Sequence, residues 1–198
     1  MKYLFLCLYA LFLLSAPSFA RAEACVDLSR QFGYEVRDLT EPQIKEIFGE
    51  LLIVAGIDPR EVMLCKGNLG DPLAASLELD QHYPNSIVAL RAATIADLEP
   101  IAIKAWLAHE LCHVKLALDN VAQPQSVNGN SFEQVMGNET RCDAMAVGWV
   151  GKDLMMKALR EARAEAAAAG TNAFSAYGSQ FYVRVMDRRI LALEHLTD

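Results

Sequence analysis

The residues best suited to chemistry lie together in one short segment, His109-Glu110-Leu111-Cys112-His113. In a helix, residues four apart share a face, so His109 and His113 can present two imidazole nitrogens to one metal ion. Glu110 follows the first histidine, and its carboxylate can take a proton from a metal-bound water there. The surrounding residues are apolar, a setting that two solvated histidines would not need. The segment therefore predicts a metal-binding helix that also carries a general base.

A catalytic zinc ion usually has three protein ligands, so a third ligand must come from elsewhere in the chain. Glu139 and Asp143 are four residues apart in a helical segment that continues into apolar residues. Glu139 can reach the metal, while Asp143 can accept a hydrogen bond from the free nitrogen of a ligating histidine. Asp119 and Glu133 are alternatives. Asp119 is disfavoured because the residues before it continue the helix and carry it away from the metal.

The elements that position these residues are mostly helices. Apolar residues at helical spacing predict helices over residues 41–55, 98–118, 139–169 and 174–196. Thr40 could cap the first of these helices, and Gly56 would end it. The second helix carries the metal motif, follows a connection over residues 92–97 and has Pro100 in its first turn. A capping box at Ser131 could begin a further helix, which Gly137 could interrupt.

Strands are expected only in the first half of the chain. Apolar and β-branched runs predict strands over residues 61–65 and 86–90, and residues 73–82 could be strand or loop. The chain has no internal repeat and no linker that would divide it. We therefore expect one domain over residues 21–198.

Residues 1–20 have the pattern of a secretory signal peptide. Lys2 precedes an apolar run, which ends in the small residues expected before a cleavage site at Ala20. The run is too short to span a bilayer comfortably, since a spanning helix needs about 20 apolar residues. Cleavage after Ala22, an uncleaved anchor and lipoprotein processing at Cys25 are the alternatives.

The remaining composition is typical of an exported, acidic protein. Loss of Lys2, the only charged residue of the signal, moves the formal net charge from −7 to −8. An acidic surface argues against a nucleic-acid partner. Four cysteines remain after Cys7 is lost, which suggests two disulfides with three possible pairings. We expect no stable membrane span after signal removal, and a periplasmic protein if the source is Gram-negative or a secreted one otherwise.

The pattern His-Glu-x-x-His, followed on a later helix by Glu-x-x-x-Asp, resembles the gluzincin metallopeptidases. The chain is similar to the family of the CAAX prenyl endopeptidase and the bacterial heat-shock membrane protease, which has soluble periplasmic members. The similarity covers about residues 84–196 and includes a strand before the motif helix and an Arg-Ile-x-x-Leu segment at Arg189. The resemblance implies a zincin-like domain of the α+β class, mostly helical, with a small antiparallel or mixed sheet beside the metal-binding helices.

Two cysteines distinguish this chain from that family. The usual Gly before the second histidine is Cys112, and the usual Ala before the aspartate is Cys142. Each follows a proposed ligand by three residues, so the two lie near each other if both helices meet at one metal. We therefore expect a Cys112–Cys142 disulfide, with Cys25–Cys65 as the remaining pair. Two buried thiols, or metal ligation by Cys112, are the alternatives.

The resemblance implies an exported zinc endopeptidase with one Zn²⁺ per chain, held by His109, His113 and Glu139. Glu110 would activate the zinc-bound water and then protonate the leaving amine. The strand at residues 86–90 would form the cleft rim and bind a protein or peptide substrate in extended form. Candidate donors to the oxyanion are Tyr177, Tyr182, Arg188, Arg189 and His195. A non-catalytic or regulatory zinc-binding protein on the same fold, or a helical interaction protein with a chance motif, are the competing hypotheses.

Overall fold

The computed structural model describes residue 25 and residues 35–67, 74–78, 86–121, 132–168 and 179–196. These residues form a mostly helical α+β fold with one four-stranded mixed sheet. The strands are β1 (Val36–Asp38), β2 (Val62–Gly67), β3 (Ala74–Glu78) and β4 (Ser86–Arg91). The helices are α3 (Pro42–Ala55), α4 (Ala92–Asp97), α5 (Pro100–Leu118), α6 (Phe132–Val150), α7 (Lys152–Ala168) and α8 (Ser179–Glu194). The expected signal peptide over residues 1–20 lies outside the described residues.

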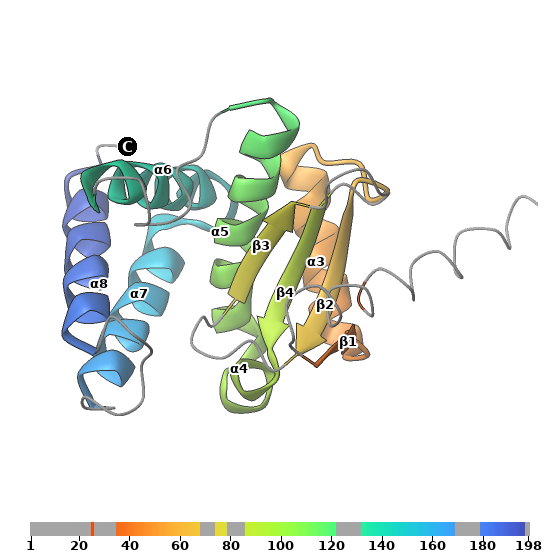
Figure 1. The fold of residues 1–198 in the computed structure, drawn as a ribbon, viewed down its shortest axis with the longest axis horizontal. Helices are drawn as coiled ribbons and strands as arrows, with labels where there is room; N and C mark the ends of the chain where they lie inside the picture. The colour runs from red at the N-terminus through yellow and green to blue at the C-terminus, as the bar shows by residue number, and fades with distance from the viewer. Residues whose placement is uncertain are drawn as a thin grey trace, which may run out of the picture.

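The sheet has the order β1-β2-β4-β3, in which β2 and β4 are parallel and the other neighbours are antiparallel (Figure 1). The strand β4 is buried on both faces, with Val88 and Leu90 in the main core and Ile87 and Ala89 on the opposite face. A strand that is paired on both edges cannot accept another strand. The expectation that residues 86–90 would form the rim for an extended substrate is therefore wrong. Among the described strands, β3 is the edge on that side.

Helix α5 lies between the sheet and the pair formed by α7 and α8 (Figure 1). Thirteen of its nineteen residues are buried. Its apolar side chains share the main core with those of α3 and with Val88. A helix that is buried on nearly all sides can carry polar side chains only where neighbouring elements supply partners. The buried His109, Glu110 and His113 therefore depend on the helices that pack against α5.

Some helix boundaries differ from those expected. The connection expected over residues 92–97 is helix α4, and the single helix expected over residues 139–169 is divided between α6 and α7. The division lies at Gly151, whose φ of 89° is a left-handed conformation that glycine adopts without strain. Helix α6 begins at Phe132 and runs through Gly137 without interruption.

Helix α3 begins and ends close to where the sequence places it. Its N-cap is Glu41 rather than Thr40, and Pro42 occupies the first turn, where its fixed φ suits a helix start. Gly56 ends the helix in a left-handed conformation with a φ of 65°. The ambiguous region over residues 73–82 contains the strand β3.

The described cysteines form the two expected pairs. Cys25 is bonded to Cys65 of β2, with the Cα atoms 5.9 Å apart, on the sheet face opposite the main core. Cys112 of α5 is bonded to Cys142 of α6, with the Cα atoms 5.2 Å apart. One disulfide therefore fastens an N-terminal residue to the sheet, and the other joins two helices.

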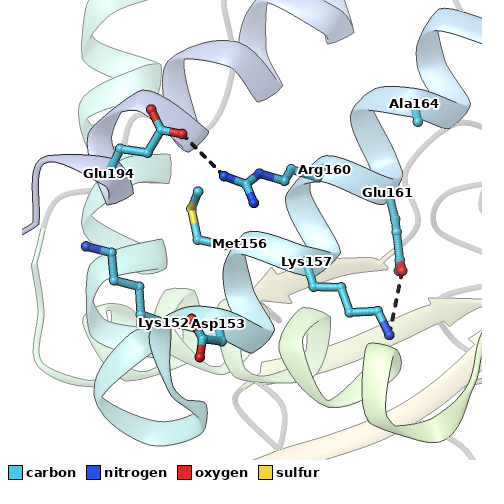
Figure 2. Close-up of a pocket in the computed structure, with 8 residues that line it drawn as sticks. All are labelled: Lys152, Asp153, Met156, Lys157, Arg160, Glu161, Ala164 and Glu194. Atoms are coloured by element: carbon cyan, nitrogen blue, oxygen red, sulfur yellow. Dashed lines mark hydrogen bonds and ion pairs between the residues drawn. The ribbon is translucent and has the colours of Figure 1, made fainter.

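A shallow groove of about 610 Å³ lies along α7 and the end of α8 (Figure 2). Three of its side chains are acidic and three are basic, and two of the basic ones pair with acidic neighbours: Lys157 with Glu161 and Arg160 with Glu194. The groove therefore offers no concentrated charge of one sign to a ligand. Among the described residues, no helix is long and apolar enough to cross a membrane.

Candidate metal centre

The site begins with polar side chains on the inner faces of α5. His109, Glu110 and His113 have exposed fractions of only 2%, 8% and 8%. The two histidines are one helical turn apart, and their ring centroids are 4.9 Å apart. Their Nε2 atoms lie 3.2 Å from each other. Helix α5 thus aims two ring nitrogens at one point, as the spacing of the sequence predicts.

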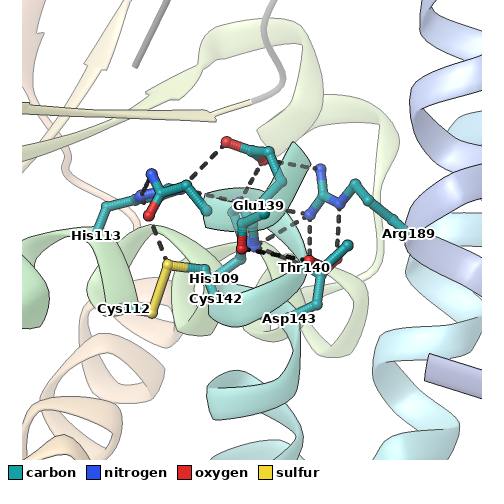
Figure 3. The surroundings of a disulfide bond; sticks show 10 residues. His109, Cys112, His113, Glu139, Thr140, Cys142, Asp143 and Arg189 are labelled. Carbon is teal, nitrogen blue, oxygen red and sulfur yellow. Dashed lines mark hydrogen bonds and ion pairs between the residues drawn. A yellow bond between two sulfur atoms is a disulfide. The ribbon is translucent and has the colours of Figure 1, made fainter. Parts of the chain in front are cut away.

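Helix α6 brings Glu139 to the same point (Figure 3). Its carboxylate oxygens lie 3.1 Å from His109 Nε2 and 3.6 Å from His113 Nε2. The possible ligand atoms of the three residues all lie within 4.8 Å of one another. A tetrahedral zinc ion about 2.1 Å from each ligand separates its ligand atoms by about 3.4 Å. The three residues therefore fit a small tetrahedral ion, with one position left for a fourth ligand.

Asp143, one turn after Glu139 on α6, fixes the ring of His109. Its Oδ1 atom lies 2.9 Å from His109 Nδ1, and its side chain is fully buried. An ionised carboxylate can only accept, so His109 donates from Nδ1 and turns its Nε2 toward Glu139 and His113. Loss of the Nε2 proton would leave a lone pair at this position for a metal. A carboxylate on the free nitrogen of a metal-ligating histidine orients the ring in the same way.

Arg189 of α8 completes this side of the site. Its Nε and Nη2 atoms donate to the two oxygens of Asp143 at 2.7 and 2.6 Å, and its Nη1 lies 3.4 Å from Glu139. The guanidinium also lies 5.6 Å from the ring centroid of Trp106, within the range of a cation–π contact. Figure 3 shows this arginine reaching from α8 toward α5 and α6. Three helices therefore meet at one buried ionic network.

Burial and opposite charges together set the pKa values here. Burial and the charge of Arg189 oppose protonation of His109, but Asp143 and Glu139 outweigh them and raise its pKa to about 9. Burial opposes ionisation of Glu139, but His109, Arg189 and His113 lower its pKa to about 2. Burial also opposes ionisation of Asp143, and Arg189 and His109 hold its pKa below the usual value. Both carboxylates are therefore ionised at neutral pH.

Arg189 stays charged in spite of its burial. Burial disfavours the guanidinium, but Asp143, Glu139 and Glu110 outweigh this effect and raise the pKa of Arg189 above its usual value. Glu110 therefore belongs to the same electrostatic cluster, although it is not one of the three residues whose ligand atoms converge. The sequence singled out Arg189 as a possible donor to an oxyanion. In the structure its Nε and Nη2 are directed at Asp143.

The other ring nitrogen of His113 has partners on α6. Asn138 Nδ2 lies 3.4 Å from His113 Nδ1, and the Sγ of Cys142 lies 3.5 Å from the same atom. An amide can present its oxygen or its nitrogen to this position, because the two ends are interchangeable by rotation. Sequence reasoning missed Asn138. Its spacing of four residues from Cys142 places it on the same helix face and was the available signal.

The other described candidates lie apart from the three converging ligand residues. Asp119 lies beyond the end of α5 and accepts a hydrogen bond from Lys115 at 3.0 Å. Glu133 forms an exposed ion pair with Arg188 at 2.9 Å. Tyr182 contacts the ring of Phe181, and His195 is exposed after the end of α8. Tyr177 lies outside the described residues.

Comparison of the chain with protein-family models, with curated proteins and with solved structures finds no match. The interpretation of the site therefore rests on its own residues and geometry.

Proposed function

We propose that the protein is an exported zinc-dependent endopeptidase of the gluzincin type, with a zincin-like fold. The observation that carries this proposal is the convergence of His109, His113 and Glu139, with the buried Glu110 next to His109 in the sequence of α5. Two imidazole nitrogens and one carboxylate oxygen, with one position left open, are a ligand set of catalytic zinc. A structural zinc site would use four protein ligands and would need no additional acid beside them.

Zinc is the metal that the donor set favours. Imidazole ligands suit zinc better than magnesium or calcium, which prefer oxygen donors, and the close spacing of the ligand atoms suits a tetrahedral ion. When bound, zinc supplies Lewis acidity toward a water and toward the scissile carbonyl. Asp143 and Arg189 hold His109 in the tautomer that such binding needs.

Glu110 is the proposed general base. It follows His109 on α5, is buried and interacts electrostatically with Arg189, and these observations support the assignment. The carboxylate accepts the proton of the attacking water and then delivers it to the leaving amine. Because Arg189 is already bound to Asp143, it acts as a positioning residue for His109 in this scheme rather than as a donor to the oxyanion.

The substrate is proposed to bind in extended form along β3. This strand pairs with β4 on one side and packs near α5, the helix that carries the histidines. The outer edge of such a strand presents backbone N–H and C=O groups to an added strand. An unfolded polypeptide outside the cytoplasm is therefore the proposed substrate class. The two disulfides are compatible with an exported protein.

The test is the variant Glu110→Gln, with cleavage of an unfolded protein and bound zinc measured on the same preparation. We expect zinc content to stay at one per chain while the cleavage rate falls by at least about 100-fold, the contribution of a general base. The exposed Glu133→Gln serves as the control and should cleave at the wild-type rate. Wild-type cleavage by Glu110→Gln would rule out the proposed mechanism. Zinc binding without cleavage by the wild type would favour a non-catalytic zinc protein.

A further inference from the structure

The Cys112–Cys142 disulfide lies within the metal centre rather than at the surface. Both cysteines are fully buried. Cys112 precedes His113 on α5, and Cys142 precedes Asp143 on α6, so the bond joins the two ligand-bearing helices between their site residues (Figure 3). A covalent link at this place restricts how far Glu139 can move from the two histidines.

The disulfide also touches one of the proposed ligands. The Sγ atom of Cys142 lies 3.5 Å from His113 Nδ1. A disulfide sulfur carries no proton, so in this contact it can only accept, and weakly, from the ring N–H. A proton on Nδ1 leaves the Nε2 lone pair free to bind a metal. A free thiol at the same place could instead donate to Nδ1 and favour the opposite tautomer.

The contacts around the disulfide suggest that the position of His113 depends on it. Cys112, Leu116 and Cys142 form a small buried cluster, separate from the main core, with Met145 and Trp149 packed against it. Asp143 and Arg189 supply a strong ionic link, but they act on His109. Two groups near His113 Nδ1, the amide of Asn138 and the sulfur, are neutral. With Nδ1 protonated, the amide presents its oxygen to the ring.

We propose that the Cys112–Cys142 disulfide is a positioning group for metal binding, which holds α5 to α6 and favours the tautomer of His113 that is protonated on Nδ1. The inference rests on the proposed function only in requiring that zinc binds at this cluster. It requires no catalytic turnover. It assigns to the disulfide a role in metal affinity, in addition to any contribution to the stability of the fold.

The experiment compares two double variants of the full-length chain, Cys112→Ala/Cys142→Ala and Cys25→Ala/Cys65→Ala. The two disulfides span 30 and 40 residues, and loop entropy depends only on the logarithm of that number. Loss of either disulfide should therefore raise the conformational entropy of the unfolded chain by a similar amount. The zinc Kd is measured by competition with a chromogenic chelator, and circular dichroism checks that each variant is folded.

We expect the Kd to rise by about 10- to 100-fold in Cys112→Ala/Cys142→Ala, the range found when partners of metal ligands are removed. In Cys25→Ala/Cys65→Ala it should change by less than about threefold. Equal Kd values in the two variants would overturn the inference. If wild type binds no zinc, the proposed function itself fails. If wild type binds zinc and Cys112→Ala/Cys142→Ala binds it equally well, only the role of the disulfide fails.

A second measurement applies if Cys112→Ala/Cys142→Ala does not fold. Folded, zinc-loaded Cys25→Ala/Cys65→Ala is treated with a water-soluble phosphine. Each disulfide reduced consumes one phosphine and one water; the phosphorus becomes a phosphine oxide, and the two hydrogens of the water complete the two thiols. We expect zinc release, measured with an indicator dye, to proceed at the same rate as the appearance of two new thiols per chain. Thiols that appear while zinc stays bound would contradict the inference.

Discussion

His109 and His113 lie one helical turn apart on α5, but their Nδ1 atoms have different kinds of partner. His109 faces the carboxylate of Asp143 at 2.9 Å, which Arg189 binds through two further hydrogen bonds. His113 faces the amide of Asn138 at 3.4 Å and the sulfur of Cys142 at 3.5 Å. Charge-assisted hydrogen bonds are shorter and about twice as strong as neutral ones. The Nδ1 atom of His109 therefore faces charged partners, whereas that of His113 faces a neutral amide and a disulfide sulfur.

The two sides also differ in the elements that they join. The network of His109 includes α8, because Arg189 reaches across from that helix to Asp143 and Glu139. The amide and the sulfur near His113 Nδ1 both come from α6. A change on the His109 side should therefore affect the packing of three helices, whereas a change on the His113 side should act locally.

The largest effect is expected for Asp143→Ala. This change leaves the guanidinium of Arg189, whose side chain is 4% exposed, without its closest partner in the interior. Breaking a buried ion pair by removing one member costs about 3–5 kcal/mol. We expect a loss of that size in the free energy of unfolding, measured with urea, together with a zinc Kd raised by about 10- to 100-fold.

The matched control is Asp187→Ala on the surface. Asp187 pairs with Arg163, and these side chains are 50% and 43% exposed. Exposed ion pairs contribute about 0–1 kcal/mol. The free energy of unfolding should therefore change little, and the zinc affinity should equal that of wild type. If Asp143→Ala and Asp187→Ala lowered the free energy of unfolding and the zinc affinity by similar amounts, the network around His109 would not stabilise the site as proposed.

A smaller effect is expected for Asn138→Ala on the other side. The change removes one neutral partner of His113 Nδ1 and leaves the sulfur of Cys142 in place. A neutral hydrogen bond contributes about 1 kcal/mol, so the zinc Kd should rise by less than about tenfold. Calorimetric titration with zinc measures the change. A larger loss of zinc affinity from Asn138→Ala than from Asp143→Ala would mean that the contacts of His113 contribute more to zinc binding than those of His109, contrary to our expectation.

The parts of the site that depend on local spacing could be predicted from the sequence. His109 with His113, and Glu139 with Asp143, are each four residues apart, so a helix alone places each pair on one face. The roles of Arg189 and Asn138 could not be predicted in this way. The bond from Arg189 to Asp143 spans 46 residues and depends on how α8 packs against α6, which no local pattern specifies.

The fold shows the same division between local and distant interactions. The strand at residues 86–90 was predictable from its β-branched run, but its central place in the sheet results from pairing with β2 and β3. The break between α6 and α7 was missed because the residues on both sides of Gly151 favour helix. Local preference therefore located the longer helices and the strands β2 and β4, but not α4 or β1, and tertiary packing decided which elements are neighbours.

The central claim is that His109, His113 and Glu139 together bind one zinc ion. The most direct test is the zinc content of purified protein, measured by atomic emission for wild type, His113→Ala, Glu139→Ala and the control Asp119→Ala. We expect one zinc per chain in wild type and in Asp119→Ala, and a zinc content near zero in His113→Ala and Glu139→Ala. A wild-type protein without stoichiometric zinc, or a Glu139→Ala variant that retains the full amount, would contradict this claim.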